Sequence, residues 1–183
     1  MVTVLVNGLP GSGKTTLARA LSAELHLPLF SKDSIKETLA DTLGPVRPAG
    51  CSDREWSRAL GAAAGETLWT LLADARGAAV LESPWLAHVR PFVRAGLQRA
   101  GAGVVCEVWC EVPPAVARDR FAARSPSRHA VHHEGPEGFG GDWEFWSLGA
   151  EPLGLGSVHR VDTTQPVDIA GLATALMAPR GSR

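Results

Sequence analysis

Eight consecutive residues near the start of the chain have the spacing of a phosphate-binding loop. They read Gly8-Leu9-Pro10-Gly11-Ser12-Gly13-Lys14-Thr15 and complete the pattern G-x-x-x-x-G-K-[ST]. Glycines let such a loop curl so that successive backbone N–H groups point at phosphate oxygens. Lys14 would reach the β- and γ-phosphates, the Thr15 hydroxyl would ligate Mg²⁺, and Thr16 would lie near the α-phosphate. The pattern therefore predicts binding of a nucleoside triphosphate with Mg²⁺.

The residues around this loop support the prediction. A continuous apolar and β-branched run, Val2–Val6, is typical of a parallel strand that is buried on both faces. After the loop, Leu17, Leu21 and Leu25 recur at steps of four and predict the apolar stripe of a helix over residues 14–25. Strand, loop and helix occur in the order that phosphate binding requires. A glycine-rich turn without a ligand is the disfavoured alternative.

Two carboxylates stand at the ends of predicted strands. Asp33 follows a short strand near Pro28–Ser31, and Glu82 ends the run Ala78–Glu82. Carboxyl ends of parallel strands face the ligand crevice. Because Ser34 is the better helix cap, we expect Asp33 to be catalytic or to orient an acceptor. Glu82 would hold Mg²⁺ directly or through water. Because Asp is the usual residue at such a strand end, two other roles stay open for Glu82, namely acceptor binding and a solvated position.

Four arginines follow the next strand, at positions 118, 120, 124 and 128. Arg120 and Arg124 share one helix face, from which they could neutralise charge on a transferred phosphoryl group. For Arg118 we expect a solvated position, whereas Arg128 is open to either reading. Three histidines come next, His129, His132 and His133, and lack cysteines or carboxylates at zinc-ligand spacing. Acceptor binding or packing is the favoured interpretation for them.

Strand-like and helix-like segments alternate, which predicts an α/β fold with a parallel sheet. Two capping boxes, Ser34–Glu37 and Ser52–Glu55, should each begin a helix. Residues 125–156 break the alternation and predict a long loop that orders over the site. We expect one domain over residues 1–178, a lid and acceptor region at about 113–156, and a frayed tail at 179–183. The remaining predicted elements are helices over 88–100, 113–124 and 164–177 and strands over 104–110 and 158–161.

The composition of the chain excludes several classes of protein. The 183 residues carry a formal net charge of −1, so there is no general attraction to nucleic acid or to an anionic membrane. No apolar run approaches the roughly 18 residues of a membrane span. The three cysteines are an odd number, and Cys106 and Cys110 should pack in the core of a strand. These features lead us to expect a cytoplasmic protein.

Together these motifs resemble those of small P-loop kinases, the AAA-family ATPase-like group with zeta-toxin-like and chloramphenicol-phosphotransferase-like proteins. The resemblance covers about residues 1–128 and 157–178. The matching segments are Gly8–Thr15, Phe30–Asp33, Glu82, Arg118–Arg124 and Val161–Thr164.

The resemblance implies a P-loop nucleoside-triphosphate hydrolase fold of the nucleoside-kinase-like type. Its sheet would have five parallel strands in the order 2-3-1-4-5, with helices on both faces. It further implies ATP as the donor, Asp33 as general base, and Arg120 or Arg124 on the phosphates. The turn Asp162–Gln165 would lie near the adenine.

These observations favour a kinase that transfers the γ-phosphate of ATP to a hydroxyl of a small molecule, such as an antibiotic, a nucleoside or a sugar-like compound. A polynucleotide-end kinase is a second hypothesis, which the missing basic stripe disfavours. A regulatory P-loop ATPase or nucleotide switch is a third. It would need neither Asp33 nor the lid arginines, and no Asn-Lys-x-Asp guanine signature is present.

Overall fold

Five parallel strands form one sheet in the computed structural model, which describes residues 1–132 and 140–178. Their order is β2-β3-β1-β4-β5, so the predicted fold class and strand order are confirmed. Ser31 and Val6 both pair with Glu82, which brings the carboxyl ends of β2, β3 and β1 to one level. The strands are β1 (Val2–Asn7), β2 (Leu29–Ser31), β3 (Ala79–Glu82), β4 (Val104–Glu111) and β5 (Ser157–Asp162).

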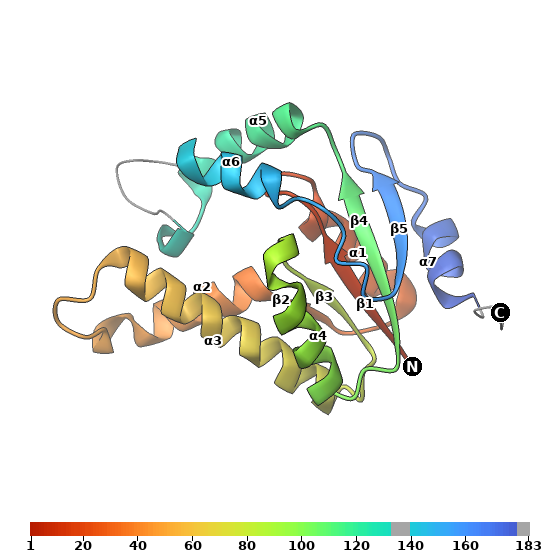
Figure 1. The fold of residues 1–183 in the computed structure, drawn as a ribbon, viewed down its shortest axis with the longest axis horizontal. Helices are drawn as coiled ribbons and strands as arrows, with labels where there is room; N and C mark the ends of the chain where they lie inside the picture. Colours follow the sequence, from red (N-terminus) through yellow and green to blue (C-terminus); the bar gives the residue numbers. More distant parts are fainter. Residues whose placement is uncertain (133–139, 179–183) are drawn as a thin grey trace.

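Helices cover both faces of this sheet, and others extend beyond the carboxyl ends of its strands (Figure 1). α1 and α7 pack on one face, while α3 and α4 pack on the other. α5 and α6 lie above the carboxyl ends, and α2 runs along α3 away from the sheet. The helices are α1 (Lys14–Leu25), α2 (Lys32–Leu43), α3 (Asp53–Asp74), α4 (Arg90–Arg99), α5 (Pro114–Arg124), α6 (Gly140–Leu148) and α7 (Ile169–Met177).

The two faces of β1 explain its largely apolar sequence. Val4 and Val6 point into a core that includes Leu17 and Leu21 of α1, whereas Leu5 points into the opposite core with Leu68 and Leu72 of α3. Successive side chains of a strand alternate in this way. Both faces are buried, so most positions are apolar, and the polar side chains of Thr3 and Asn7 are hydrogen-bonded.

Cys106 and Cys110 belong to the first of these cores, so the expected core packing is confirmed. Within the described parts of the chain, no helix is both long and apolar enough to cross a bilayer.

The capping box predicted at Ser34–Glu37 is wrong. α2 begins two residues earlier, at Lys32, with Ser31 as its N-cap. Glu37 is used elsewhere, since its carboxylate contacts His132. The second box is confirmed, because the Ser52 hydroxyl accepts a hydrogen bond from the backbone N–H of Glu55 at 3.3 Å and α3 begins at once.

The long loop predicted over residues 125–156 is also partly wrong, because α6 occupies residues 140–148. Tertiary packing stabilises this helix. Trp143 is buried, and Trp146 meets the ring of Phe121 edge-on at 5.5 Å. The last helix begins at Ile169, later than residue 164, since Asp168 is its N-cap. The predicted frayed tail, 179–183, lies outside the described residues.

Candidate active site

A cavity of about 880 Å³ opens where the strands end. It is lined by the phosphate-binding loop, the beginnings of α1 and α2, part of α3 and the segment from α5 to α6. Several side chains singled out in the sequence line it, among them Lys14, Thr15, Asp33, Glu82 and Arg124. These residues lie far apart in the sequence, and the sheet brings them together.

Close packing fixes the phosphate-binding loop from two sides. A Cβ at Gly11 would lie 2.1 Å from the carbonyl oxygen of Ala117, so the backbone of α5 rests directly on the loop. On the other side, the Thr163 hydroxyl donates a hydrogen bond to the Ser12 carbonyl at 2.6 Å. The turn after β5 therefore touches the loop, and the expected place of Asp162–Gln165 near the adenine stays a prediction.

Lys14 is a buried cation inside this loop. Its Nζ donates to the carbonyl oxygen of Leu9 at 3.0 Å. Burial lowers the pKa of Lys14, while the nearby carboxylates of Glu82 and Asp33 act in the opposite direction. A buried ammonium needs anionic partners to offset the loss of water. Phosphate oxygens held by the loop would provide them.

Glu82 is almost fully buried and links two elements at the end of β3. One carboxylate oxygen lies 3.4 Å from the Thr15 hydroxyl, which donates to it. The other accepts a hydrogen bond from the Ser31 hydroxyl at 2.6 Å. Carboxylate and hydroxyl oxygens are the ligands that Mg²⁺ prefers, so Thr15 and Glu82 fit a magnesium ion beside the loop.

Asp33 lies in the first turn of α2 and is half-buried. It is close enough to Lys14 to oppose the lowering of the lysine pKa, and it acts in the same way on Arg128 and His132. Asp33 is thus an anion among cations at the mouth of the phosphate-binding loop.

The two predicted lid arginines lie in different places. Arg124 lines the cavity. Arg120 is absent from its lining, and its guanidinium donates to the carbonyl oxygen of Thr163 at 3.2 Å. Arg128, for which both readings were open, lines the cavity and stacks over the ring of Phe121 at 4.6 Å. Burial lowers the pKa of Arg128, with Asp33 acting against this change.

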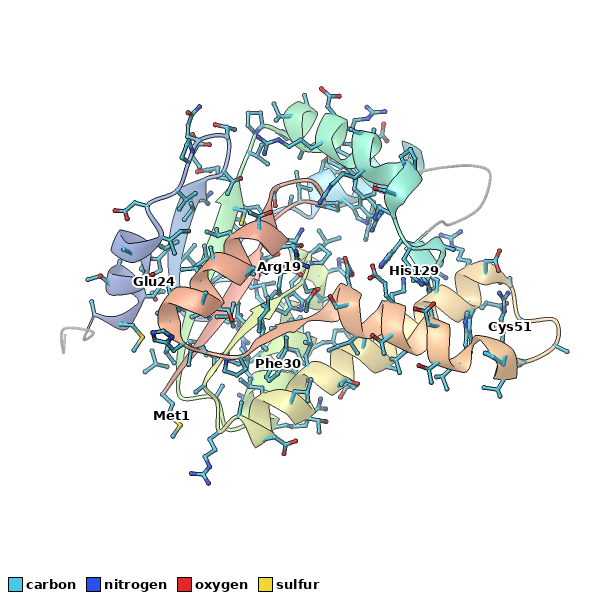
Figure 2. All side chains as sticks on the ribbon, turned by 180° about the vertical axis from the view of Figure 1, so that it is seen from behind. Met1, Arg19, Glu24, Phe30, Cys51 and His129 are labelled. Carbon is cyan, nitrogen blue, oxygen red and sulfur yellow. The ribbon has the colours of Figure 1, made fainter. Side chains whose placement is uncertain are left out.

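His129 and His132, which follow α5 in the predicted lid region, contact α2. His132 Nε2 lies 2.9 Å from a Glu37 oxygen, and His129 Nε2 lies 3.0 Å from an Asp41 oxygen. Glu37 and Asp41 are one helical turn apart and so share a face. Figure 2 shows His129 between the lid segment and α2. Both described histidines serve packing and also line the cavity, while His133 lies outside the described residues.

Comparison with known proteins assigns the family. The model of an AAA domain matches residues 3–137, about three quarters of the chain. The chain belongs to this AAA domain family. A crystal structure of a protein from Chloroflexus aurantiacus, provisionally described as a kinase, is 30% identical with a TM-score of 0.78, and the match covers 96% of both chains.

A second solved structure agrees on the fold, and a curated relative matches a short stretch of the sequence. A sugar kinase from Janibacter sp. is 21% identical with a TM-score of 0.57, over 96% of this chain and 92% of that one. A cytidylate kinase of Pyrobaculum islandicum is 48% identical over 44 residues, which is 24% of each chain. The match therefore spans about a quarter of the length of such curated relatives. This AAA domain protein has the fold of the small P-loop kinases.

Some residues of the cavity were not assigned a role by sequence reasoning. Ser31 could have been found, because it ends the strand that pairs with Glu82. Trp146 and Phe145 belong to the segment that was expected to order over the site, but they reach the cavity from α6, a helix that was not predicted. Basic side chains on α2 and α3 were missed because helix-surface lysines and arginines are ordinarily solvated.

Proposed function

We propose that this protein is an ATP-dependent kinase that transfers the γ-phosphate to a hydroxyl group of a small molecule. The observation that carries the proposal is that one cavity contains Lys14 and Thr15 of the phosphate-binding loop together with Asp33. Phosphoryl transfer needs a bound triphosphate and a carboxylate that receives the proton of the acceptor. The residues that would meet both requirements line a single cavity.

ATP with Mg²⁺ would supply the phosphoryl group, and the chain's own residues would hold it. The backbone N–H groups of Gly8–Thr15 and the ammonium of Lys14 bind the phosphates, and Thr16 adds a contact near the α-phosphate. Thr15 and Glu82 hold the metal, with Glu82 acting directly or through water. The contacts of Glu82 with Thr15 and Ser31 keep its carboxylate in the orientation that this role needs.

Asp33 orients the acceptor hydroxyl and accepts its proton. The guanidinium of Arg124 neutralises negative charge that spreads over the transferred group. Arg120 has a different position beside the turn after β5, where it contacts Thr163. From there Arg120 holds the nucleoside side of the donor.

The decisive experiment is an ATP-consumption screen over hydroxylated metabolites and antibiotics, followed by two variants assayed with the best acceptor. Lys14→Ala should abolish transfer. Asp33→Asn should keep ATP affinity within about threefold and lower kcat by about 10²- to 10⁴-fold, as expected for loss of a general base. Asp41→Asn is the matched control on the same helix, because Asp41 contacts His129 and does not line the cavity.

Three outcomes would contradict the proposal. The first is transfer by Lys14→Ala at the wild-type rate. The second is a large loss of ATP affinity in Asp33→Asn, which would make Asp33 part of the donor site. The third is ATP binding with no transfer to any hydroxyl compound.

A second candidate function is transfer of the γ-phosphate of ATP to a phosphate group of the acceptor. The partial match to cytidylate kinases favours it. Product analysis separates the two possibilities, since transfer to a hydroxyl yields a phosphate ester and transfer to a phosphate yields an anhydride. Phosphorus NMR distinguishes these products directly.

A further inference from the structure

Three aromatic side chains line the cavity beside the groups that phosphoryl transfer needs. His88 belongs to the short helix η2 (Ala87–Val89) between β3 and α4, and Phe145 and Trp146 belong to α6. We call these three residues the aromatic wall. Lys14 and Asp33, which serve the proposed transfer, line the same cavity. Holding phosphates and receiving a proton are polar tasks, so they do not explain three rings at this place.

Two rings of the aromatic wall are exposed. Phe145 is 55% exposed, and His88 is exposed as well. Their ring centroids lie 5.3 Å apart with an interplanar angle of 50°. A ligand that covers such rings removes apolar surface from water, which favours binding. Small-molecule sites are concave and are lined mainly by apolar and aromatic side chains, so the wall has the character of a binding surface.

Contacts within the protein fix both elements that carry the aromatic wall. The Ala87 N–H donates to the Gly149 carbonyl at 3.0 Å, which ties η2 to the residue that follows α6. Within α6, Trp146 lies edge-on to the ring of Trp143 at 6.2 Å, and Trp143 is buried. The rings are therefore positioned before a ligand binds, and a surface that is already formed loses less entropy on binding.

The place of the aromatic wall in the sheet separates it from the position expected for the adenine of ATP. β2 and β3 lie on one side of β1, whereas β4 and β5 lie on the other. His88 follows β3 and Asp33 follows β2, so the wall and the proposed base share a side. β5, whose following turn is expected near the adenine, ends on the opposite side of the phosphate-binding loop.

We propose that the acceptor carries an aromatic ring in addition to the hydroxyl that is phosphorylated. The ring packs against Phe145 and His88, next to Trp146, while the hydroxyl faces Asp33. Aromatic rings contact one another in edge-to-face or offset arrangements and gain affinity beyond the area that they bury. The inference rests on the proposed kinase function. It narrows the substrate from small hydroxyl compounds in general to nucleosides and aryl compounds.

The test uses acceptors that offer the same hydroxyl groups with and without an aromatic ring. Wild-type protein is assayed with ATP and Mg²⁺ on such sets, one of which is uridine, phenyl β-D-ribofuranoside and methyl β-D-ribofuranoside. We expect a ring to raise kcat/KM at least about 10-fold over the methyl compound. The first two compounds tell whether the ring is a nucleobase or a phenyl group. Equal or better turnover of acceptors without a ring would overturn the inference and leave the kinase function intact.

Variants of the aromatic wall give the second readout. Phe145→Ala should raise the KM for a ring-bearing acceptor about 5- to 50-fold, with kcat and the KM for ATP nearly unchanged. The same variant should leave the matched acceptor without a ring unaffected, whereas a merely structural role of Phe145 would impair both. Phe145→Tyr keeps the ring and should keep the wild-type KM. The control is Phe92→Ala, which removes an exposed ring on α4 that lies outside the cavity lining.

Three results separate the inference from the function on which it rests. If Phe145→Ala and His88→Ala behave like Phe92→Ala with every acceptor, the aromatic wall does not bind the acceptor, although the protein is still a kinase. If these variants raise the KM for ATP instead, the wall holds the adenine and the inference is overturned. If no compound is phosphorylated while ATP binds, the kinase function itself fails and the inference fails with it. Thermal melting of each variant verifies that it is folded.

Discussion

Glu82 and Thr15 meet at 3.4 Å, carboxylate oxygen to hydroxyl, across the junction of β3 and the phosphate-binding loop. The two residues are far apart in the sequence. Their contact exists because β3 lies beside β1 in the sheet, in a register that pairs Glu82 with Val6. The carboxylate therefore stands beside the first turn of α1, where the phosphates and their metal would lie.

The first prediction concerns this pair. Glu82→Gln keeps the shape of the side chain and can still accept the hydrogen bond from Ser31, but it removes the negative charge. We expect affinity for Mn²⁺ in the presence of ADP, measured by electron paramagnetic resonance, to fall about 10- to 100-fold. Glu111→Gln, at the exposed end of β4, is the control. Unchanged affinity in Glu82→Gln would mean that the carboxylate holds no metal.

The sheet and the two strand-end carboxylates could be predicted because their signals are local. The residues at the end of a parallel strand or just after it face the ligand crevice, so Glu82 and Asp33 could be placed near the loop. α6 could not be predicted in this way. Trp143 and Trp146 stabilise it through Phe121, a residue on another helix, and contacts between distant segments leave no local pattern.

The lid arginines show a second limit of sequence reasoning. Arg120 and Arg124 are four residues apart and share a helix face, so they were expected to act together. Arg124 reaches the cavity, whereas Arg120 bends to the Thr163 carbonyl. Helical spacing predicts the direction in which a side chain leaves the helix axis. The end of a long side chain, however, lies where a hydrogen-bond acceptor is available. That partner is known only when the turn after β5 is placed.

The second prediction concerns the contact between the loop and α5. Gly11 has a φ of 85°, and a Cβ there would overlap the Ala117 carbonyl oxygen. Gly11→Ala should therefore shift α5, lower the free energy of unfolding by more than about 2 kcal/mol and weaken ATP binding at least about 10-fold. Urea unfolding and ATP titration measure the two effects.

Gly50 offers a matched control for Gly11. Its φ is 78°, yet a Cβ there would meet nothing within 4 Å. Gly50→Ala should cost only the backbone strain, about 1 kcal/mol, and should leave ATP affinity unchanged. Equal losses in the two variants would show that the contact with α5 adds nothing beyond the strained φ.

The third prediction concerns pH. Burial lowers the pKa of His132, with Arg128 and Lys36 acting in the same direction and Asp33 and Glu37 opposing it. The unfolded chain therefore takes up this proton first as pH falls. Stability contributed by neutral His132 is complete above the unfolded pKa of about 6.5 and is lost as pH falls towards the folded value.

His132→Gln removes this titration while retaining a group that can donate to Glu37. Between about pH 7.5 and about pH 5.5, the free energy of unfolding should fall less in His132→Gln than in the wild type. Urea unfolding at both pH values measures the difference. His159→Gln, on β5, is the control and should keep the wild-type slope. A slope unaltered by His132→Gln would show that His132 does not contribute to the pH dependence.

The last prediction concerns Glu107, a fully buried carboxylate in the middle of β4. One of its oxygens accepts hydrogen bonds from the Asn7 side chain at 3.0 Å and from the Leu153 N–H at 2.9 Å. The other accepts from the Gly154 N–H at 2.9 Å. Asn7 in turn accepts from the Gly8 N–H at 2.8 Å, so this carboxylate joins the chain that follows α6 to the start of the phosphate-binding loop.

Glu107→Gln has almost the same shape, but one oxygen becomes an N–H₂ group that faces a donor. Every donor around it is a backbone or side-chain N–H, so at least one of them loses its acceptor. The free energy of unfolding should fall by about 2 kcal/mol or more, the cost of an unsatisfied buried group. Glu111→Gln, at the exposed end of the same strand, should change the free energy of unfolding by less than about 0.5 kcal/mol.

Because Asn7 precedes the phosphate-binding loop, ATP affinity should fall in Glu107→Gln and not in Glu111→Gln. Equal stability of the two variants would refute a role for Glu107 as the link between these segments.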